Sequence, residues 1–186
     1  HEMYVKRELI LISDGISDQA NDDQADKTGE NIIEDAEKSG AKILLDGRSW
    51  KKDDGGCWVG PTVILHSSSQ DKTIREEVFG PVMCIFKVPN DSDDECIKMA
   101  NACEFGLGAS VYCRDIKRAQ YIGKHVKSGM VTINDFGCNY LIQSLPFGGV
   151  KESGFDRFAG KEGLRGCCYP RAVVNDKFPS LMTTSI

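Results

Sequence analysis

Short apolar runs alternate with amphipathic stretches along most of the chain. Apolar runs bounded by Gly, Pro or Asp predict strands at residues 41–45, 62–66, 82–88, 109–112 and 130–133. Apolar residues spaced three and four apart predict helices over residues 28–39 and after Ser92 and Asp115. Strands that alternate with helices favour right-handed crossovers, so the pattern predicts an α/β fold with a largely parallel sheet and flanking helices.

The helix after Ser92 has the clearest signals. Residues 92–95, Ser-Asp-Asp-Glu, form a capping box. Cys96, Met99, Ala100 and Cys103 follow at i, i+3, i+4 and i+7, which predicts that both cysteines lie in the core. In the helix after Asp115, the predicted buried face comprises Ile116, Ala119, Ile122, Gly123 and Val126.

The two ends of the chain carry weaker patterns. Residues 8–12 read as a short strand followed by an acidic, polar stretch, so residues 1–27 are predicted to be a divergent or flexible N-terminal segment. Residues 28–160 form the main predicted unit. Residues 161–186 hold a helix weakened by internal glycines, a β-branched strand at 172–174 and a tail.

Composition narrows the class of protein. The chain has 186 residues, 40% of them hydrophobic and 27% charged, as expected of a globular domain or a piece of a larger protein. A net charge of -5 without a basic tract argues against nucleic acid and against an anionic membrane surface. The apolar runs are too short to span a bilayer, and the N-terminus has no secretory pattern. We therefore expect an intracellular, cytoplasmic location without membrane contact by this segment.

The eight cysteines argue for a reducing compartment. They are Cys57, Cys84, Cys96, Cys103, Cys113, Cys138, Cys167 and Cys168, most of them within apolar patterns and none in a Cys-x-x-Cys pair. A disulfide framework is therefore not expected. No metal site is expected either, because the spacings match no zinc pattern and His1, His66 and His125 are scattered.

Two motifs point to a family. Residues 75–81 read Arg-Glu-Glu-Val-Phe-Gly-Pro and lead directly into the apolar run at 82–88, and residues 146–154 read Pro-Phe-Gly-Gly-Val-Lys-Glu-Ser-Gly, a loop too rich in glycine for a helix or strand interior. In this order and spacing they resemble the C-terminal part of the aldehyde dehydrogenase superfamily, over roughly residues 41–176. The stretches at 139–146 and 157–164 resemble most a plant and fungal branch whose substrate preference is poorly defined.

The resemblance implies roles for five residues. In family members the carboxylate matching Glu77 accepts hydrogen bonds from the nicotinamide ribose, and the aromatic residue matching Phe79 packs beside the nicotinamide of NAD or NADP. Asn134, Phe136 and Phe147 match positions that line the substrate cleft for the aldehyde. Roles unrelated to ligand binding stay open: Glu77 as a surface charge, Asn134 as a turn former and Phe136 as a packing residue.

Two further implications concern Lys151 and the end of the chain. Lys151 is either a solvated loop charge or fixes its loop by an ion pair, and the sequence does not choose. In the family, the strand matching residues 172–174 pairs with a neighbouring subunit, so a homo-oligomer is expected.

The main departure from the family pattern is an absence. The family nucleophile lies in a Gly-Gln-x-Cys segment, its general base in a Glu-Leu-Gly-Gly segment and its cofactor phosphates on a glycine-rich turn, and this chain contains none of these. The chain therefore resembles an incomplete catalytic domain and is expected to be inactive alone. Cys138 is a poor substitute for the nucleophile, because no neighbour in the sequence is suited to lower its pKa or act as its base.

Three hypotheses follow. The first is the C-terminal segment of an NAD(P)-dependent aldehyde dehydrogenase, which forms a thiohemiacetal on a cysteine upstream of this chain. The second is a non-catalytic derivative used for binding or assembly. The third, ranked last, is a thiol-redox protein that uses Cys57, Cys138 or the Cys167 and Cys168 pair, because adjacent cysteines rarely bridge each other without strain.

Overall fold

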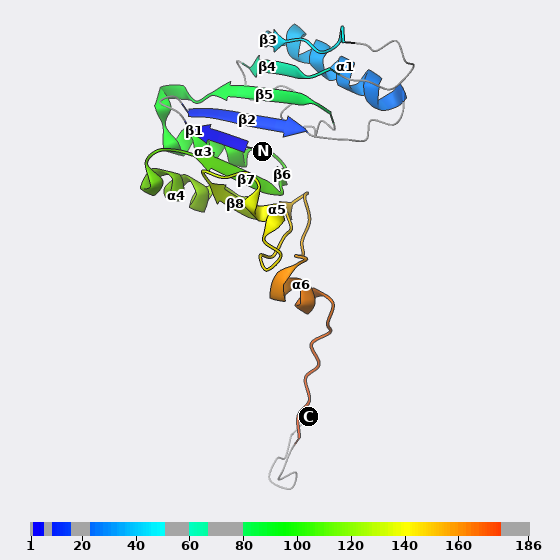
Figure 1. Ribbon diagram of the computed structural model, residues 1–186, viewed down its shortest axis with the longest axis vertical. Helices are drawn as coiled ribbons and strands as arrows, with labels where there is room; N and C mark the ends of the chain where they lie inside the picture. Colours follow the sequence, from blue (N-terminus) through cyan, green and yellow to red (C-terminus); the bar gives the residue numbers. More distant parts are fainter. Residues whose placement is uncertain (1, 6–8, 16–22, 51–59, 67–79, 176–186) are drawn as a thin grey trace, which may run out of the picture.

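A seven-stranded mixed sheet forms the centre of the molecule (Figure 1). The computed structural model describes residues 2–5, 9–15, 23–50, 60–66 and 80–175. The strands, in their order across the sheet, are β3 (Lys42–Leu45), β4 (Thr62–His66), β5 (Val82–Lys87), β2 (Leu9–Gly15), β1 (Glu2–Val5), β7 (Gly108–Tyr112) and β8 (Met130–Ile133).

Five of these strands point in the same direction. The pairs β4 with β5, β1 with β7 and β7 with β8 are parallel. The strand β2 is antiparallel to both of its neighbours, β5 and β1, so β5 and β1 share a direction. Only β2 and the edge strand β3 run the opposite way. This confirms the α/β class, and the predicted strand at residues 8–12 is part of β2.

Helices flank the sheet and define its two halves. They are α1 (Asp23–Lys38), α3 (Asp93–Asn101) and α4 (Ile116–His125), with the short helices α5 (Cys138–Leu141), α6 (Gly160–Gly166) and η1 (Pro89–Asp91) in the connections. Short antiparallel strands β6 (Phe105–Gly106) and β9 (Val150–Lys151) pair outside the main sheet. A two-residue strand thus interrupts the predicted glycine-rich loop.

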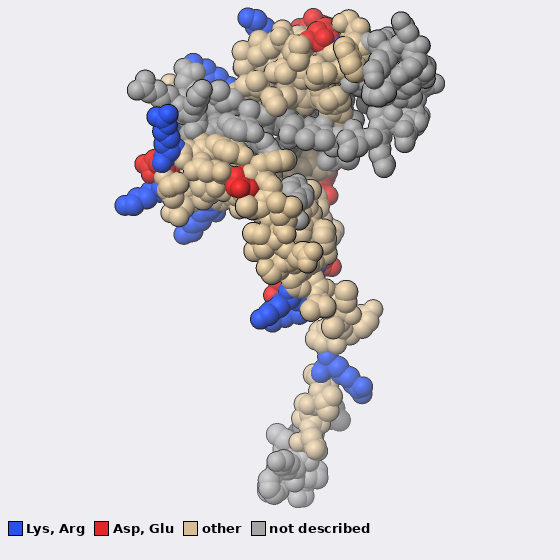
Figure 2. All heavy atoms as spheres, in the orientation of Figure 1, with Lys and Arg blue, Asp and Glu red and all other residues tan. Residues whose placement is uncertain are grey.

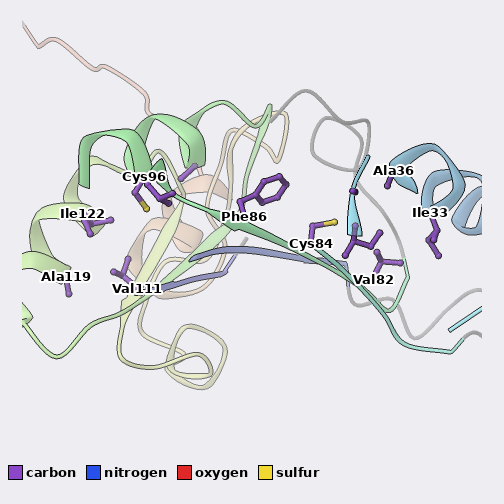
Figure 3. Close-up of a cluster of buried hydrophobic side chains, with 13 residues drawn as sticks. Ile33, Ala36, Val82, Cys84, Phe86, Cys96, Val111, Ala119 and Ile122 are labelled. Carbon is purple, nitrogen blue, oxygen red and sulfur yellow. The ribbon is translucent and has the colours of Figure 1, made fainter. Parts of the chain in front are cut away.

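The predicted core faces are largely confirmed. Cys96 and Cys103 are 0% and 4% exposed, and Ala119 and Ile122 are both fully buried. The core cluster extends from Ile33 on α1 across β4 and β5 to α3 and α4 (Figure 3). Burial raises the pKa of the Cys96 thiol to about 12, so this cysteine is an inert packing group.

One expectation is wrong in detail, and one about the end of the chain stays a prediction. Ile116 is 49% exposed, because it is the first residue of α4 and precedes the turn that packs on the sheet. Residues 172–174 form no strand within the chain, and Val173 and Val174 are 76% and 91% exposed on an arm that leaves the sheet beyond α6 (Figure 1). An edge strand requires a partner for its backbone groups, and the described residues of this chain provide none there.

Side-chain caps fix the starts of α3 and α4. Ser92 Oγ accepts a hydrogen bond from the Glu95 amide at 3.3 Å, as the capping box predicted. Asp115 Oδ1 accepts from the amides of Lys117 and Arg118 at 2.9 and 3.2 Å. The two helices are then joined by Arg118, whose Nε donates to Asp93 Oδ1 at 2.7 Å.

We predict that Asp115→Ala lowers the free energy of unfolding by about 1 kcal/mol, because two amides at the start of α4 lose their acceptor. Thermal unfolding followed by circular dichroism should show a melting temperature lower by about 2–4 °C. Gln120→Ala, an exposed position in the same helix, is the control and should leave the melting temperature unchanged. Equal stability of the two variants would contradict the prediction.

Candidate functional site

The glycine-rich loop at residues 146–154 lies against the amino ends of β7 and β8. Gly106, two residues before β7, donates its amide to Ser153 Oγ at 3.0 Å and accepts from the Gly129 amide at 3.0 Å. Gly129 in turn lies so close to the loop that a Cβ there would collide with the carbonyl oxygen of Gly148. The loop is therefore seated directly on the amino edge of the sheet.

Lys151 holds this loop to the C-terminal end of α3. Its Nζ donates to the carbonyl oxygens of Asn101 and Cys103 at 3.1 and 2.6 Å. An ammonium group is favourable there, because the last carbonyls of a helix lack partners and carry partial negative charge. The structure thus selects neither alternative considered for Lys151: the side chain is half-buried and bonds backbone carbonyls.

Asn101 extends the same network to α4. Its Nδ2 donates to the carbonyl oxygen of His125 at 2.9 Å, and its Oδ1 accepts from the Lys127 amide at 2.7 Å. Sequence reasoning missed this residue, although an asparagine that ends a helix is a known capping signal. The ends of α3 and α4 and the glycine-rich loop therefore form one connected unit.

Phe147 begins the loop on an aromatic contact. Its ring centroid lies 4.7 Å from that of Phe158, and the backbones of the two residues form an isolated antiparallel bridge. The guanidinium of Arg157 donates to the Gly149 carbonyl at 2.7 Å and closes the loop from the other side. Phe147 is consequently half-buried and fixed in position.

Asn134 and Phe136 lie at the opposite, carboxyl end of β8. Asn134 has a φ of 54° and uses its amide on both sides: Oδ1 accepts from the Cys113 amide at 2.8 Å and Nδ2 donates to the Cys113 carbonyl at 2.9 Å. This bonding favours the turn-forming alternative for Asn134. The Phe136 side chain is 48% exposed.

Two buried hydroxyl groups connect the turn after β8 to β7. Ser110 Oγ and Thr132 Oγ1 are 2.9 Å apart and buried, and Thr132 Oγ1 donates to the Asp135 carbonyl at 2.5 Å. Since Thr132 donates to Asp135, it accepts from Ser110. The turn after β8 is thereby tied to the buried face of β7.

The predicted cleft residues are therefore not all brought together. Asn134 and Phe136 share the carboxyl edge, whereas Phe147 lies with Gly148 near Gly129 on the amino edge. The rule that ligands gather at carboxyl ends of strands explains the choice of Asn134, but the chain returns along the sheet before it reaches Phe147.

Glu77 and Phe79, the predicted cofactor residues, lie outside the described residues. The description resumes at Gly80, which is buried directly before β5. The Thr62 amide donates to the Pro81 carbonyl at 2.9 Å, which places this entry at the amino ends of β4 and β5. Gly80 and the glycine-rich loop thus share the amino edge, and four strand spacings separate β5 from β8, about 19 Å.

Cys138 begins α5 and lies beside a carboxylate. Asp135 Oδ1 accepts from the Cys138 amide at 2.8 Å, and the same carboxylate hydrogen-bonds the thiol and raises its pKa. The sequence-based view that no base lies near is corrected: Asp135 is adjacent, but it disfavours the thiolate. A nucleophile needs the opposite shift.

The part of the chain that the structure describes contains neither a cluster of metal-ligating side chains nor a membrane-spanning helix. Among these residues, no group of three or more His, Cys, Asp or Glu side chains is arranged to hold a metal ion. Within the same ranges, no helix is long and apolar enough to cross a membrane. None of the seven cysteines in these ranges forms a disulfide.

Comparisons with known proteins identify the family. The sequence model of the aldehyde dehydrogenase family matches residues 17–173. An aldehyde dehydrogenase-like protein of Schizosaccharomyces pombe is 40% identical over 156 residues, which cover 83% of this chain and 29% of that protein. A similar protein of Saccharomyces cerevisiae is 38% identical, with 83% and 24% covered.

Solved structures agree in fold. Betaine aldehyde dehydrogenase from Staphylococcus aureus in complex with NAD+ has a TM-score of 0.70 and 31% identity, covering 82% of this chain and 32% of that one. Salicylaldehyde dehydrogenase from Pseudomonas putida complexed with salicylaldehyde has a TM-score of 0.67 and 28% identity, covering 77% and 28%. The chain belongs to the aldehyde dehydrogenase family, whose members use NAD or NADP, and it spans less than a third of the length of these relatives.

We predict that Lys151→Met lowers the free energy of unfolding by about 1–2 kcal/mol, because two carbonyls at the end of α3 lose a charged donor. Hydrogen exchange should increase selectively in residues 146–154. Lys161→Met, at an exposed position on α6, serves as the matched control. Unchanged exchange in the loop of the Lys151 variant would show that the contact does not hold it.

We also predict that Asp135→Asn speeds alkylation of Cys138 at pH 8. The carboxylate raises the pKa of the thiol, so its neutralisation lowers that pKa and increases the thiolate fraction, while the amide oxygen still accepts from the Cys138 backbone. The rate is followed per cysteine by mass spectrometry across a pH series. Asp156→Asn, at an exposed loop position, should leave the profile of Cys138 unmoved, and identical profiles for both variants would contradict the assignment.

Proposed function

We propose that this chain is the C-terminal segment of an NAD(P)-dependent aldehyde dehydrogenase that oxidises an aldehyde to a carboxylic acid. The observation that carries the proposal is the shared amino edge: the glycine-rich loop with Phe147 and the entry to β5 after Glu77 and Phe79 belong to the same edge of the sheet. Family membership supplies the reaction class. Its relatives include enzymes named for betaine aldehyde and 3-sulfolactaldehyde.

The reaction divides between this chain and the rest of the enzyme. A cysteine upstream attacks the aldehyde carbon to form a thiohemiacetal, loss of hydride leaves a thioester, and water releases the acid and regenerates the thiol. NAD or NADP supplies the hydride acceptor when bound. The residues of this chain bind and orient.

The cofactor roles rest on two side chains. The Glu77 carboxylate accepts hydrogen bonds from both ribose hydroxyls, since it has acceptor capacity for two donors at once. Phe79 packs beside the nicotinamide. Both lie within three residues of Gly80 in the sequence, and Gly80 is buried at the entry to β5.

The support for a role in the substrate cleft differs among Phe147, Phe136 and Asn134. Phe147 is fixed by Phe158 and lies on the same edge of the sheet as Gly80 at the entry to β5, which supports direct contact with the aldehyde. Phe136 is exposed at the far end of β8 and lines the approach. Asn134 contributes by holding the turn through Cys113.

The arm beyond the sheet is proposed to join subunits of a homo-oligomer. Large apolar side chains are exposed along it, namely Tyr169 at 99%, Val173 at 76% and Val174 at 91%. Much of the arm surface in Figure 2 carries no charge. Pairing of residues 172–174 with a neighbouring sheet would give this backbone its partners.

Free thiols fit a reducing, cytoplasmic location.

A non-catalytic derivative is the second candidate. The observation that favours it is the position of β1 and β2 in the middle of the sheet, although residues 2–5 and 9–15 precede the family match at residue 17. Such a derivative would keep the family fold for binding or assembly without the catalytic cysteine.

The native polypeptide decides between the candidates. We predict that an antibody raised against residues 80–175 detects a band more than twice the 20.5 kDa of this chain in source cells. The captured protein should form NAD(P)H with a panel of aldehydes, whereas the purified 186-residue chain, as the matched control, should not.

A band at the size of this chain, without turnover, would overturn the dehydrogenase proposal in favour of the binding protein. Turnover by the short chain that disappears in Cys138→Ser would instead overturn the assignment of the nucleophile to an upstream segment.

A further inference from the structure

An ionised carboxylate lies in the turn that follows β8. Asp135 Oδ1 accepts a hydrogen bond from the Cys138 amide at 2.8 Å. The pKa of the Asp135 carboxyl is lowered by this bond first, and then by the Cys138 thiol and the Gly137 amide, which also donate to the carboxylate. Asp135 therefore carries its negative charge at neutral pH.

This charge has no counter-cation in the part of the chain that the structure describes. None of the ion pairs among these residues includes Asp135. Asp91 and Asp93, by contrast, both pair with Arg118. A carboxylate that no Lys or Arg of the described chain neutralises favours a cation that approaches from solution.

Asp135 is held in place from two sides. Its carboxylate is bound to the start of α5, and its carbonyl oxygen accepts a hydrogen bond from Thr132 Oγ1. Thr132 is itself buried and lies 2.9 Å from the hydroxyl of Ser110. Because the charge is already fixed, a ligand that binds it does not have to order this side chain.

The segment around Asp135 exposes apolar side chains. Phe136, Leu141 and Ile142 are 48%, 81% and 43% exposed. They lie in or beside the single turn of α5, in which the Leu141 amide donates to the Gly137 carbonyl at 3.3 Å, and α5 packs beside β8 (Figure 1). An apolar surface with one fixed charge suits a ligand that has an apolar body and a group of the opposite charge.

The aromatic residue next to the carboxylate also favours a cation. Phe136 directly follows Asp135, and the face of an aromatic ring attracts an ammonium group within about 6 Å. The methyl or methylene groups of an alkylammonium ion can contact the ring while the carboxylate attracts its charge. An uncharged ligand gains nothing from the charge of Asp135, and an anionic ligand is repelled by it.

We propose that Asp135 and Phe136 select aldehydes that carry an amino or quaternary ammonium group at the end remote from the carbonyl. The inference rests on the proposed function, because it assigns a substrate class to the approach that Phe136 is proposed to line. Asp135 binds the cationic end of the substrate, and the aldehyde group extends toward the catalytic groups of the full enzyme.

The test uses the full-length enzyme with two aldehydes of the same shape: a trimethylammonio-substituted butanal, and its uncharged isostere in which carbon replaces the quaternary nitrogen. Asp135→Asn should lower the ratio of kcat/KM for the cationic to the uncharged aldehyde about tenfold. The amide removes the charge but keeps an oxygen that accepts from the Cys138 backbone, so α5 retains its cap.

Two further measurements separate charge from shape. Phe136→Leu should lower the same ratio about threefold, because leucine keeps an apolar side chain but lacks the aromatic face. Added salt should lower the ratio of the wild-type enzyme more than that of the Asp135→Asn enzyme, because salt screens the attraction to the carboxylate.

Asp156→Asn is the matched control, because it makes the same change of charge at an exposed loop position. Its ratio should equal that of the wild type. Turnover of both aldehydes with a ratio that Asp135→Asn lowers no more than Asp156→Asn does would overturn the inference and leave the proposed function standing. Failure to oxidise these or any other aldehydes would overturn the proposed function, and the inference with it.

Discussion

Backbone pairing in the middle of the sheet is the constraint on which the rest of this structure depends. The sheet brings β5 and β7 into one layer without making them neighbours, and β2 and β1 lie between them. The entry to β5 belongs to one half and the glycine-rich loop to the other. Without the middle strands, the two parts of the candidate site would have no common frame, and Phe86 and Val111 would lose the continuous layer that excludes water from them.

Around β7 and β8, hydrogen bonds to the ends of α3 and α4 position the glycine-rich loop. Asn101, the last residue of α3, donates through its side-chain amide to the His125 carbonyl at the end of α4 and accepts from the Lys127 amide, and its backbone carbonyl accepts from Lys151 of the loop. These bonds involve groups that an α-helix leaves without partners, so they stabilise the helices and locate the loop at the same time. A displacement of α3 relative to α4 would therefore be transmitted to Phe147 through the loop.

Local features were predictable because they depend on neighbouring residues. The cap at Ser92, the buried cysteines of α3 and the strands at 62–66 and 130–133 follow from spacing and turn chemistry alone. The separation of Phe147 from Asn134 was not predictable, since it depends on the path by which the chain returns along the sheet. The contacts of Lys151 join residues 48 and 50 positions apart, and no local pattern encodes such a pairing.

The two ends of the chain were harder to predict for a related reason. Residues 172–174 have the composition of a strand, but strand formation requires a second edge, and β-branched composition by itself does not supply one. The strands β1 and β2 were indicated only by a short apolar run, because their place between β5 and β7 depends on pairing with strands about 70 or more residues away in the chain. Glu77 and Phe79 fall outside the described residues, so their roles stay predictions.

The use of polar side chains around the site indicates which part of the chemistry this chain can provide. Asn134 bonds Cys113 on both sides, Ser153 accepts from Gly106, and Lys151 donates to two carbonyls. Each of these side chains hydrogen-bonds backbone groups and thereby stabilises the backbone around the candidate site. A catalytic thiol needs a neighbour that favours its thiolate, whereas the neighbour of Cys138 raises its pKa. The described residues therefore suit the binding and orienting roles that the proposed function assigns to this chain.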